Sequence, residues 1–317
     1  MTCFHPIAAW RSTENTPNGK KRIVFKQSEN SLLPITLPCG RCIGCKLERS
    51  LMWAIRSVHE AQLKPQNCFI TLTYAPEHLP SDGSLLKSHF QTFMKSLRKD
   101  YPPRTIRYFM CGEYGTKPQT LDMLTAPGKL HRPHYHACLF GIDFPDKIIH
   151  EEKEGILLYT SEILTNHWDK GFCTIGELNF DTAAYTARYI TKKITGDLAA
   201  DHYTTTCPTT GQTIHLEPEY TTMSRRPGLA KEWYEKYKSD IYPSDFLIYQ
   251  GKTIKTPRYY DNIYDVDDPE ALQEIKHKRK ARAKTRSKDS TPERLAVREK
   301  IQLLNFNKLI RSYENEL

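Results

Sequence analysis

The sequence predicts an α+β fold in which helices pack on a mainly antiparallel central sheet. Short apolar runs at residues 68–74, 106–112 and 134–141 have the length of strands, and segments with apolar residues three or four positions apart accompany them. In the expected order, βαββαβα, two strands follow each other directly, which favours antiparallel pairing. A chain of 317 residues can bury a substantial core and can form one elaborated domain or two.

The first half of the chain is expected to start irregularly and then to form a helix, a strand and a second helix. The start is rich in Pro and Asn and gives way near Cys39 to the first helix, which Pro65 ends. The apolar stripe of this helix consists of Leu47, Leu51, Ile55 and Val58. A strand follows at residues 68–74. The apolar positions of the second helix are Leu86, Phe90, Phe93 and Leu97.

The second half of the predicted sheet adds two strands, a helix, a strand and a last helix. The first four of these have the expected ranges 106–112, 134–141, 161–168 and 172–178. Asp181 is expected to cap the last helix, and Gly196 to end it. Further on, a terminal helix that packs on the body or on a partner is indicated by Leu303, Phe306, Ile310 and Tyr313.

Two histidines and one glutamate are candidates for a metal site. His134 and His136 stand at i and i+2 at the head of a strand, so both imidazoles project from one face and Tyr135 from the other. If residues 106–112 pair antiparallel with this strand, Glu113 lies beside His134 and adds an oxygen ligand. Such a site suits Mg²⁺ or Mn²⁺. The alternative is a surface carboxylate and two strand histidines with ordinary partners.

Two tyrosines of the last predicted helix are candidates for one active site. Tyr185 and Tyr189 are four residues apart, and Lys192 follows at a position on the same side of the helix. A neighbouring ammonium, from Lys192 or in part from Lys193, would favour a phenolate or neutralise phosphate charge. Alternatively, the tyrosines are core aromatics and the lysine is solvated. A second pair with this spacing, interpreted as background because an aspartate replaces the lysine, is Tyr260 and Tyr264.

Nine cysteines suggest reduced thiols or a metal site rather than disulfides. Cys39, Cys42 and Cys45 precede a helix at a spacing typical of zinc or of an iron–sulfur cluster, but zinc needs a fourth ligand. The nearest candidates are Cys3 and His5. Three unligated thiols are the alternative. Four cysteines in predicted strands are expected to be core residues: Cys68, Cys111, Cys138 and Cys173.

The charge of the chain fits a nucleic-acid-binding protein without proving it. Lys and Arg number 46 against 37 Asp and Glu, a formal net charge of +9. Arg225 and Arg226 offer two guanidiniums to phosphates. Residues 276–288 hold eight Lys or Arg, typical of a disordered segment that binds nucleic acid or of a solvated linker. No apolar stretch approaches the length of a membrane span, and no signal-peptide core is present near the first residues.

Three segments together resemble the HUH superfamily of rolling-circle replication initiators: residues 68–74, 132–140 and 185–193. Longer motifs narrow the resemblance to the replication initiator of small single-stranded-DNA phages, the gokushovirus branch of the microviruses; they lie at residues 38–45, 111–115, 223–228, 235–240 and 257–261. The resemblance spans about residues 38–265. It departs from the superfamily pattern in one place, because Tyr135 replaces an aliphatic residue between the histidines.

The resemblance implies a metal-dependent nickase that cuts one DNA strand through a 5′-phosphotyrosine and then joins unit-length single-stranded circles. Its expected partners are single-stranded origin DNA of the viral genome and the helicase and replication proteins of the host, in the host cytoplasm. The runner-up in the superfamily is a plasmid relaxase or single-strand transposase. A rival of another class is a non-enzymatic, zinc-stabilised nucleic-acid-binding protein.

Four parts of the chain are expected on this basis. Residues 1–64 form an N-terminal segment with the cysteines and a helix, and residues 65–200 form the HUH endonuclease core. Residues 201–270 extend this core. Residues 271–317 are expected to form a basic linker and a terminal amphipathic helix.

Overall fold

The computed structural model describes residues 3–17, 19, 21–115, 132–153, 155–194, 196, 198–206, 211–285 and 287–308. For residues 153, 189–192 and 198 the description is limited to the backbone. The chain divides into two compact units. The larger contains Ser50–Asp267, and the smaller combines Met1–Arg49 with Asp268–Arg311.

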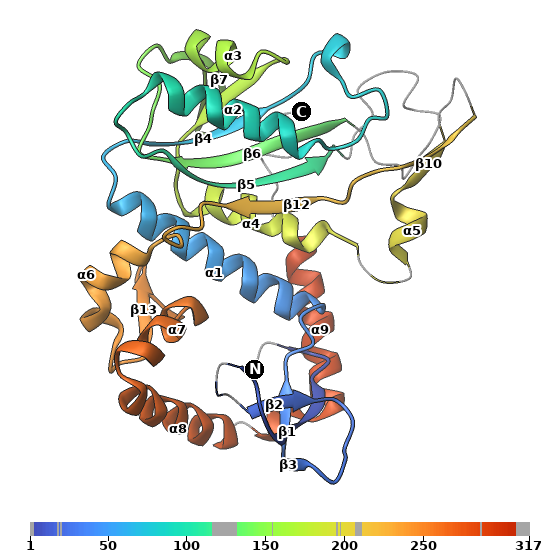
Figure 1. The fold of residues 1–317 in the computed structure, drawn as a ribbon, viewed down its shortest axis with the longest axis vertical. Coiled ribbons are helices and arrows are strands. Elements are labelled where there is room, and N and C mark those ends of the chain that lie inside the picture. Colours follow the sequence, from blue (N-terminus) through green and yellow to red (C-terminus); the bar gives the residue numbers. More distant parts are fainter. Residues whose placement is uncertain are drawn as a thin grey trace. The chain divides into compact units, whose positions relative to one another are not determined.

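The larger unit is built on an antiparallel sheet. Within the described residues seven strands form it, in the order β12-β5-β6-β4-β9-β8-β7 (Figure 1). These strands are β4 (Asn67–Leu72), β5 (Arg107–Tyr114), β6 (Pro133–Phe140), β7 (Ile148–Lys153), β8 (Ile156–Thr160), β9 (Cys173–Gly176) and β12 (Tyr220–Met223). In the register of β6 with its two neighbours, His134 pairs with Glu113 and His136 with Thr71.

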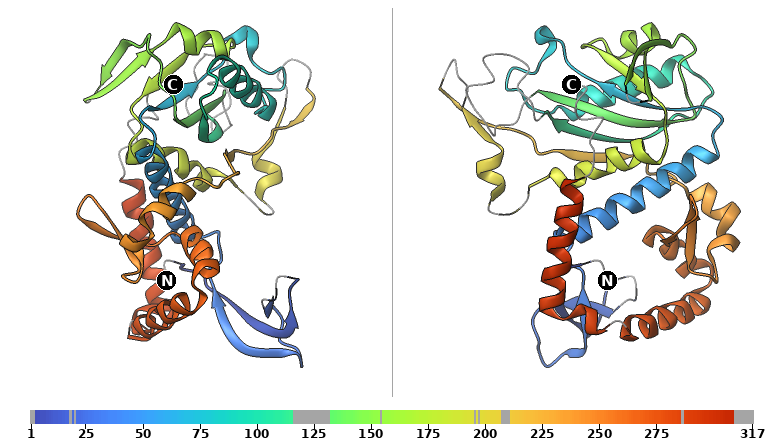
Figure 2. Two further views of the ribbon diagram at one scale, coloured as in Figure 1. Left: turned by 60° about the vertical axis from the view of Figure 1, so that its left-hand side comes forward. Right: turned by 180° about the vertical axis from the view of Figure 1, so that it is seen from behind.

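Helices cover both faces of this sheet, so every residue of β6 is buried (Figure 2). On one face lie α2 (Lys87–Asp100) and α3 (Glu162–Trp168), whose Phe90, Phe93 and Trp168 pack in one cluster with Tyr135. On the other face lie α4 (Phe180–Lys192) and the second half of α1 (Ile43–Gln62). The even and odd residues of β6 therefore enter two different cores.

The structure confirms the α+β fold and the order βαββαβα from β4 to α4, with two additions. A hairpin, β7 and β8, is inserted between β6 and α3, and β12 joins the edge of the sheet beside β5. The four cysteines expected in strands lie buried there, as predicted: Cys68, Cys111, Cys138 and Cys173.

The ends of α4 differ from the prediction. Asn179, not Asp181, is the N-cap: its side chain accepts hydrogen bonds from the N–H groups of Asp181 and Thr182, and the Thr182 hydroxyl accepts one from the Asn179 N–H. The capping box therefore starts the helix two residues before the predicted cap. The helix ends at Lys192, before Gly196, and Lys193 is the C-cap.

The smaller unit corrects the expectation of an irregular start. Its N-terminal residues form a three-stranded antiparallel sheet in the order β2-β1-β3: β1 (Ile7–Asn15), β2 (Lys21–Val24) and β3 (Ser31–Leu37). The basic run is not the disordered linker expected, because Pro269–Thr285 form helix α8, which buries Leu272 and Ile275. Helix α9 spans Pro292–Asn307 and exposes Leu303, while Ile310 and Tyr313 lie outside the described residues.

The remaining elements of the described chain are short: η1 (Pro76–His78), α5 (Leu198–His202), β10 (Thr204–Thr206), β11 (Thr213–His215), α6 (Lys231–Ile241), β13 (Phe246–Tyr249), β14 (Lys252–Lys255), α7 (Arg258–Asp267) and η3 (Ser287–Ser290). Tyr260, of the second tyrosine pair, is a core residue of α7 whose ring stacks on Trp233 and Tyr234. None of the helices described combines the length and the apolar character that crossing a bilayer requires.

Candidate functional site

The alternation of β6 places its two histidines and its tyrosine on opposite faces. The Tyr135 hydroxyl lies among α2-side residues, where it donates to the Leu86 carbonyl at 2.9 Å and accepts from the Leu86 N–H at 3.1 Å. His134 and His136 project from the other face with Cys138. Tyr135 is thus a satisfied core residue, and its departure from the family pattern does not disturb the histidines.

Glu113, His134 and His136 converge on one point between β5 and β6. Nε2 of His134 lies 2.8 Å, and Nε2 of His136 3.0 Å, from the same carboxylate oxygen, Oε1 of Glu113. One ligand atom from each residue lies within 4.8 Å of the others, so the three residues could hold a metal ion. All three are buried. The antiparallel register predicted for these strands is confirmed, because Glu113 pairs with His134.

Hydrogen bonds to the far nitrogens fix how the two rings are oriented. Nδ1 of His134 lies 3.2 Å from the Arg132 carbonyl oxygen, which can only accept, so Nδ1 carries the proton and Nε2 of the neutral ring offers a lone pair. Nδ1 of His136 lies 2.9 Å from the Thr71 hydroxyl on β4. Sequence reasoning assigned no role to Thr71, because only the pairing of β4 with β6 reveals this contact.

The carboxyl group of Glu113 is ionised at neutral pH. Burial by itself raises its pKa, but the charge of His134 and the hydrogen bonds of both histidines outweigh burial and lower the pKa from 4.5 to about 2. A carboxylate and two imidazole nitrogens in a buried pocket form a donor set that suits a divalent ion.

Tyr185 lies beside these three residues. Its hydroxyl oxygen is 3.4 Å from Nε2 of His136, and its ring meets the His136 ring edge-on at 5.0 Å. The Phe69 ring of β4 packs against both, stacked on His136 and perpendicular to Tyr185. Helix α4 therefore brings one predicted tyrosine to the predicted metal ligands.

The other predicted residues of α4 are less fully described. Tyr189 and Lys192 belong to α4 by their backbone, four and seven residues after Tyr185, but their side chains lie outside the described residues. Lys193 is partly buried at the C-cap.

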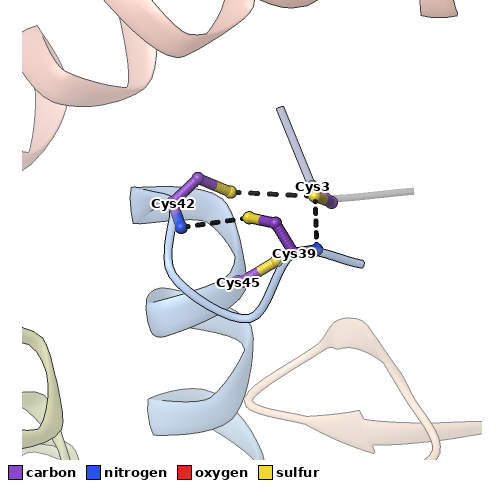
Figure 3. Close-up of side chains that lie close together, drawn as sticks. All are labelled: Cys3, Cys39, Cys42 and Cys45. Carbon is purple, nitrogen blue, oxygen red and sulfur yellow. Dashed lines mark hydrogen bonds between the residues drawn. The ribbon is translucent and has the colours of Figure 1, made fainter. Parts of the chain in front are cut away.

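The smaller unit brings four cysteines together. The sulfurs of Cys3, Cys39, Cys42 and Cys45 lie within 4.8 Å of one another, so this cluster could hold a zinc ion (Figure 3). Of the two candidates for a fourth ligand, the structure brings in Cys3 and not His5. The His5 side chain is largely exposed, and its Nε2 lies 2.7 Å from Oε2 of Glu299.

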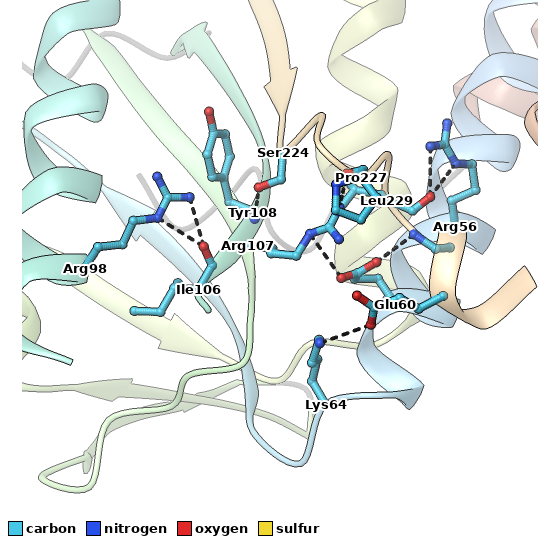
Figure 4. A network of polar contacts seen from close by, with 12 residues as sticks. Arg56, Glu60, Lys64, Arg98, Ile106, Arg107, Tyr108, Ser224, Pro227 and Leu229 are labelled. Atoms are coloured by element: carbon cyan, nitrogen blue, oxygen red, sulfur yellow. Dashed lines mark hydrogen bonds and ion pairs between the residues drawn. The ribbon is translucent and has the colours of Figure 1, made fainter. Parts of the chain in front are cut away.

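The loop that carries Arg225 and Arg226 is held firmly to β5. The Tyr108 N–H donates to the Ser224 hydroxyl at 3.1 Å, the Ser224 N–H donates to the Tyr108 carbonyl at 3.0 Å, and the Arg107 guanidinium donates to the Pro227 carbonyl at 2.6 Å (Figure 4). Arg225 and Arg226 are exposed, and the structure gives their guanidiniums no ion-pair partner among the described residues.

A buried charged network fixes the far end of this loop to α1. Arg56 donates to the Leu229 carbonyl at 2.9 Å, and Oε2 of Glu60 accepts from the Ala230 N–H at 2.6 Å (Figure 4). Oε1 of Glu60 forms an ion pair with Nε of Arg107 at 3.3 Å, without the geometry of a hydrogen bond. The loop thus presents two exposed cations from a rigid support, which sequence reasoning did not foresee.

Comparison with known proteins agrees with this geometry. The profile of the family described as replication-associated protein ORF2 matches residues 67–194. The chain is 34% identical to the replication-associated protein ORF2 of Spiroplasma virus 4 over 311 residues, covering 90% of this chain and 87% of that protein. The chain belongs to this family. The family match begins in β4 and ends just beyond α4, so it contains Glu113, both histidines and Tyr185.

Two further relatives in this phage replication-protein family are less similar. The chain is 31% identical to the replication-associated protein VP4 of Bdellovibrio phage phiMH2K, over 90% of this chain and 84% of the relative. It is 26% identical to the replication-associated protein ORF4 of Chlamydia phage 1, over 72% of this chain and 53% of the relative. No solved structure matches the chain significantly. The resemblance to gokushovirus replication proteins is confirmed.

Proposed function

We propose that this chain initiates rolling-circle replication as a metal-dependent nickase and strand transferase acting on one DNA strand. A single observation carries the proposal: the Tyr185 hydroxyl lies 3.4 Å from a histidine that, with a second histidine and a glutamate, converges on one point. A nucleophile next to a candidate metal site is what phosphotyrosine formation requires. Membership of a replication-associated phage family supports the same activity.

The three convergent residues fit a divalent metal ion. The His134 tautomer directs a lone pair to the centre, and the carboxylate of Glu113 balances positive charge there. One oxygen and two nitrogen ligands leave positions open for phosphate oxygens and suit Mg²⁺ or Mn²⁺. When bound, such an ion supplies Lewis-acid withdrawal of charge from the scissile phosphate.

The chain itself supplies the nucleophile and its placement. The Tyr185 oxygen attacks phosphorus, an O–P bond to the tyrosine forms, and the bond from phosphorus to the 3′-oxygen breaks. The 5′-phosphate remains on the protein, and the phenolic proton is balanced by the one that the released 3′-hydroxyl takes up. Phe69 and His136 hold the tyrosine ring on two sides, which fixes its approach. We assign to Lys192, and in part to Lys193, the neutralisation of phosphate charge.

A second tyrosine allows the reaction to repeat. After one genome length has been copied, a new cut is needed while the first 5′ end is still bound to protein. Tyr189 follows Tyr185 by one helical turn on α4 and makes this cut in the proposed scheme. The released 3′-hydroxyl then attacks the older phosphotyrosine, which closes a unit-length circle and frees the first tyrosine. No external energy source is needed, because each step exchanges one phosphodiester for another.

Arg225 and Arg226 provide a phosphate contact for the strand in this proposal. They follow β12, which pairs with β5, and they lie next to Tyr108, five residues from Glu113 along β5. Five residues of strand correspond to about 17 Å, the span of a few nucleotides. Because the loop is anchored at both ends, little conformational entropy is lost when its guanidiniums bind phosphates.

One experiment tests the proposed function. The purified chain is mixed with end-labelled single-stranded DNA that contains the viral origin, with Mg²⁺ or with a chelator. We expect a protein–DNA adduct that survives denaturation and forms only with the metal, and closed unit-length circles when the substrate carries two origins. Binding without an adduct would identify the non-enzymatic binding protein instead. An adduct without circle closure would favour the relaxase or transposase.

A further inference from the structure

We propose that Cys3, Cys39, Cys42 and Cys45 bind one zinc ion as four thiolates, and that this ion joins the N-terminal sheet to the first turn of α1. The site lies entirely in the smaller unit and does not depend on the proposed nickase activity. Its role is to hold the fold together, because four protein ligands leave no position for a substrate.

The sheet register brings the four ligands to one place. Ile7 at the start of β1 pairs with Leu37 at the end of β3, so the chain segments before and after this pair are neighbours. Cys3 lies four residues before the pair and Cys39 two residues after it. The chain then turns at Gly40, whose φ of +74° is a conformation that other residues rarely adopt, and continues to Cys42 and Cys45. A ligand 36 residues away in sequence is thereby placed beside the other three.

The spacing of the sulfurs matches a tetrahedral zinc site. A Zn–S bond of about 2.3 Å places the ligand sulfurs of a tetrahedron about 3.8 Å apart. The sulfurs of Cys3 and Cys42 are 3.9 Å apart, far beyond the roughly 2.05 Å of a disulfide. The cysteines of the described residues are free, including these four. Figure 3 shows the four side chains gathered around the turn that leads into α1.

Backbone N–H groups point at the sulfurs in the manner of a metal-bound thiolate site. The sulfur of Cys39 accepts from the N–H groups of Arg41 and Cys42, at 3.4 and 3.3 Å. The sulfur of Cys3 accepts from the Cys39 N–H at 3.2 Å, and the sulfur of Cys42 from the Phe4 N–H at 3.3 Å. Four thiolates around one divalent zinc carry a net negative charge, and such donors stabilise that charge in a buried site.

The smaller unit has little else to stabilise this junction. Its cluster of buried apolar residues consists of Cys3, Phe4, Cys42, Cys45 and Leu295, so three of its five members are cysteines. A core of this size supplies little hydrophobic free energy, and small units of this kind commonly need a metal or disulfides. With the other described cysteines also unpaired, metal binding accounts for the cluster better than oxidation does.

The test measures metal content in the full chain purified without chelators. We expect about one zinc per chain by elemental analysis. Cys42→Ala should lose this zinc, whereas the matched control Cys173→Ala, which removes a buried thiol of β9, should retain it. His136→Ala should also retain it, which separates this site from the proposed catalytic one. Substitution by Co²⁺ should give the visible absorption of a tetrahedral thiolate site.

The wild-type chain keeps the test decisive even if Cys42→Ala does not fold. Four thiols should resist alkylation in the purified protein and react once a strong chelator removes zinc. Iron with a visible charge-transfer spectrum, or metal-free protein whose four thiols react at once, would overturn the proposal.

Discussion

The hydroxyl oxygen of Tyr185 lies 3.4 Å from Nε2 of His136, the same nitrogen that lies 3.0 Å from Oε1 of Glu113. One imidazole nitrogen thus faces both the proposed nucleophile and the proposed metal position. Nδ1 of this ring is held by Thr71, so the ring cannot turn without breaking a buried hydrogen bond. The relationship makes His136 the residue on which both parts of the proposed reaction depend.

Removing a metal ligand should stop nicking without stopping DNA binding. His134→Ala and His136→Ala should lower the rate of adduct formation by about 10²-fold or more, because the transition state is no longer stabilised by the metal charge. Affinity for single-stranded DNA should stay close to the wild-type value, since basic residues elsewhere supply the phosphate contacts. Glu113→Ala should behave similarly and recover partly with Mn²⁺, which binds nitrogen ligands more tightly than Mg²⁺. His150→Ala, an exposed histidine of β7, is the control.

The arginine loop should contribute to affinity in a salt-dependent way. Replacing Arg225 and Arg226 by Ala should weaken binding to single-stranded DNA of any sequence. The slope of log affinity against log salt should fall by about 0.7 for each phosphate that the double variant no longer binds. Fluorescence anisotropy at several salt concentrations measures this slope. Lys95→Ala, an exposed cation on α2, should leave it unchanged, and an unaltered slope in the double variant would remove the loop from the DNA-binding surface.

The buried carboxylate of Glu60 should be costly to remove. Glu60 and Arg107 are almost inaccessible to solvent, so Glu60→Ala leaves an unpaired buried guanidinium and should lower the free energy of unfolding by about 3 to 5 kcal/mol. Glu232→Ala, which breaks the exposed ion pair with Lys64, should cost less than about 1 kcal/mol. Urea unfolding measures both values. Similar costs for the two variants would contradict the network described.

Mild acid should destabilise the larger unit through His59. Burial lowers the pKa of this histidine from 6.5 to about 3, so the unfolded chain takes up the proton more readily than the folded chain. The stabilising contribution is complete above pH 6.5 and is lost as the pH falls from 6.5 toward 3, with about 2 kcal/mol lost between pH 7 and pH 5. Glu113, whose pKa is lowered from 4.5 to about 2, contributes only below this range.

The variant His59→Gln isolates this effect. Its amide can still meet the Tyr260 hydroxyl, which lies 2.7 Å from Nδ1 of His59, but it does not titrate. The free energy of unfolding of the variant should change little between pH 7 and pH 5. An equal loss of stability in variant and wild type would show that another group is responsible.

The sequence predicts the site well where local patterns determine geometry. Alternation along a strand gives the shared face of His134 and His136, and antiparallel pairing of two consecutive apolar runs gives the register that brings in Glu113. Contacts that depend on distant pairing are not visible in this way. The roles of Thr71 and Phe69 follow from the pairing of β4 with β6, and the anchoring of residues 224–230 follows from α1.

Two differences in the fold have a clear physical reason. Strands β2 and β3 are mostly exposed on both faces, so their sequences carry no apolar alternation from which a strand could be predicted. Helix α8 contains Ala, Leu, Glu and Lys, which have high helix propensity, and it buries Leu272 and Ile275. These features outweigh the like-charge repulsion of its basic run.

The paired tyrosines should differ from one nucleophile in a measurable way. Tyr185→Phe and Tyr189→Phe should each keep some single-turnover nicking but form successive unit-length circles poorly, because one tyrosine cannot attack while it is esterified. The double variant should form no adduct. Lys192→Ala should slow cleavage and joining without moving the attachment point. Tyr264→Phe, from the pair with the same spacing on α7, should act as wild type.

The central claim is tested most directly by locating the bond between protein and DNA. After reaction with origin DNA and Mg²⁺, the adduct is digested with protease and nuclease, and the peptide that carries a nucleotide is sequenced by mass spectrometry. We expect the phosphate on Tyr185 or Tyr189 in the wild type, and on Tyr189 alone in Tyr185→Phe. A phosphate on any residue outside α4, or cleavage with no covalent adduct, would contradict the proposed mechanism.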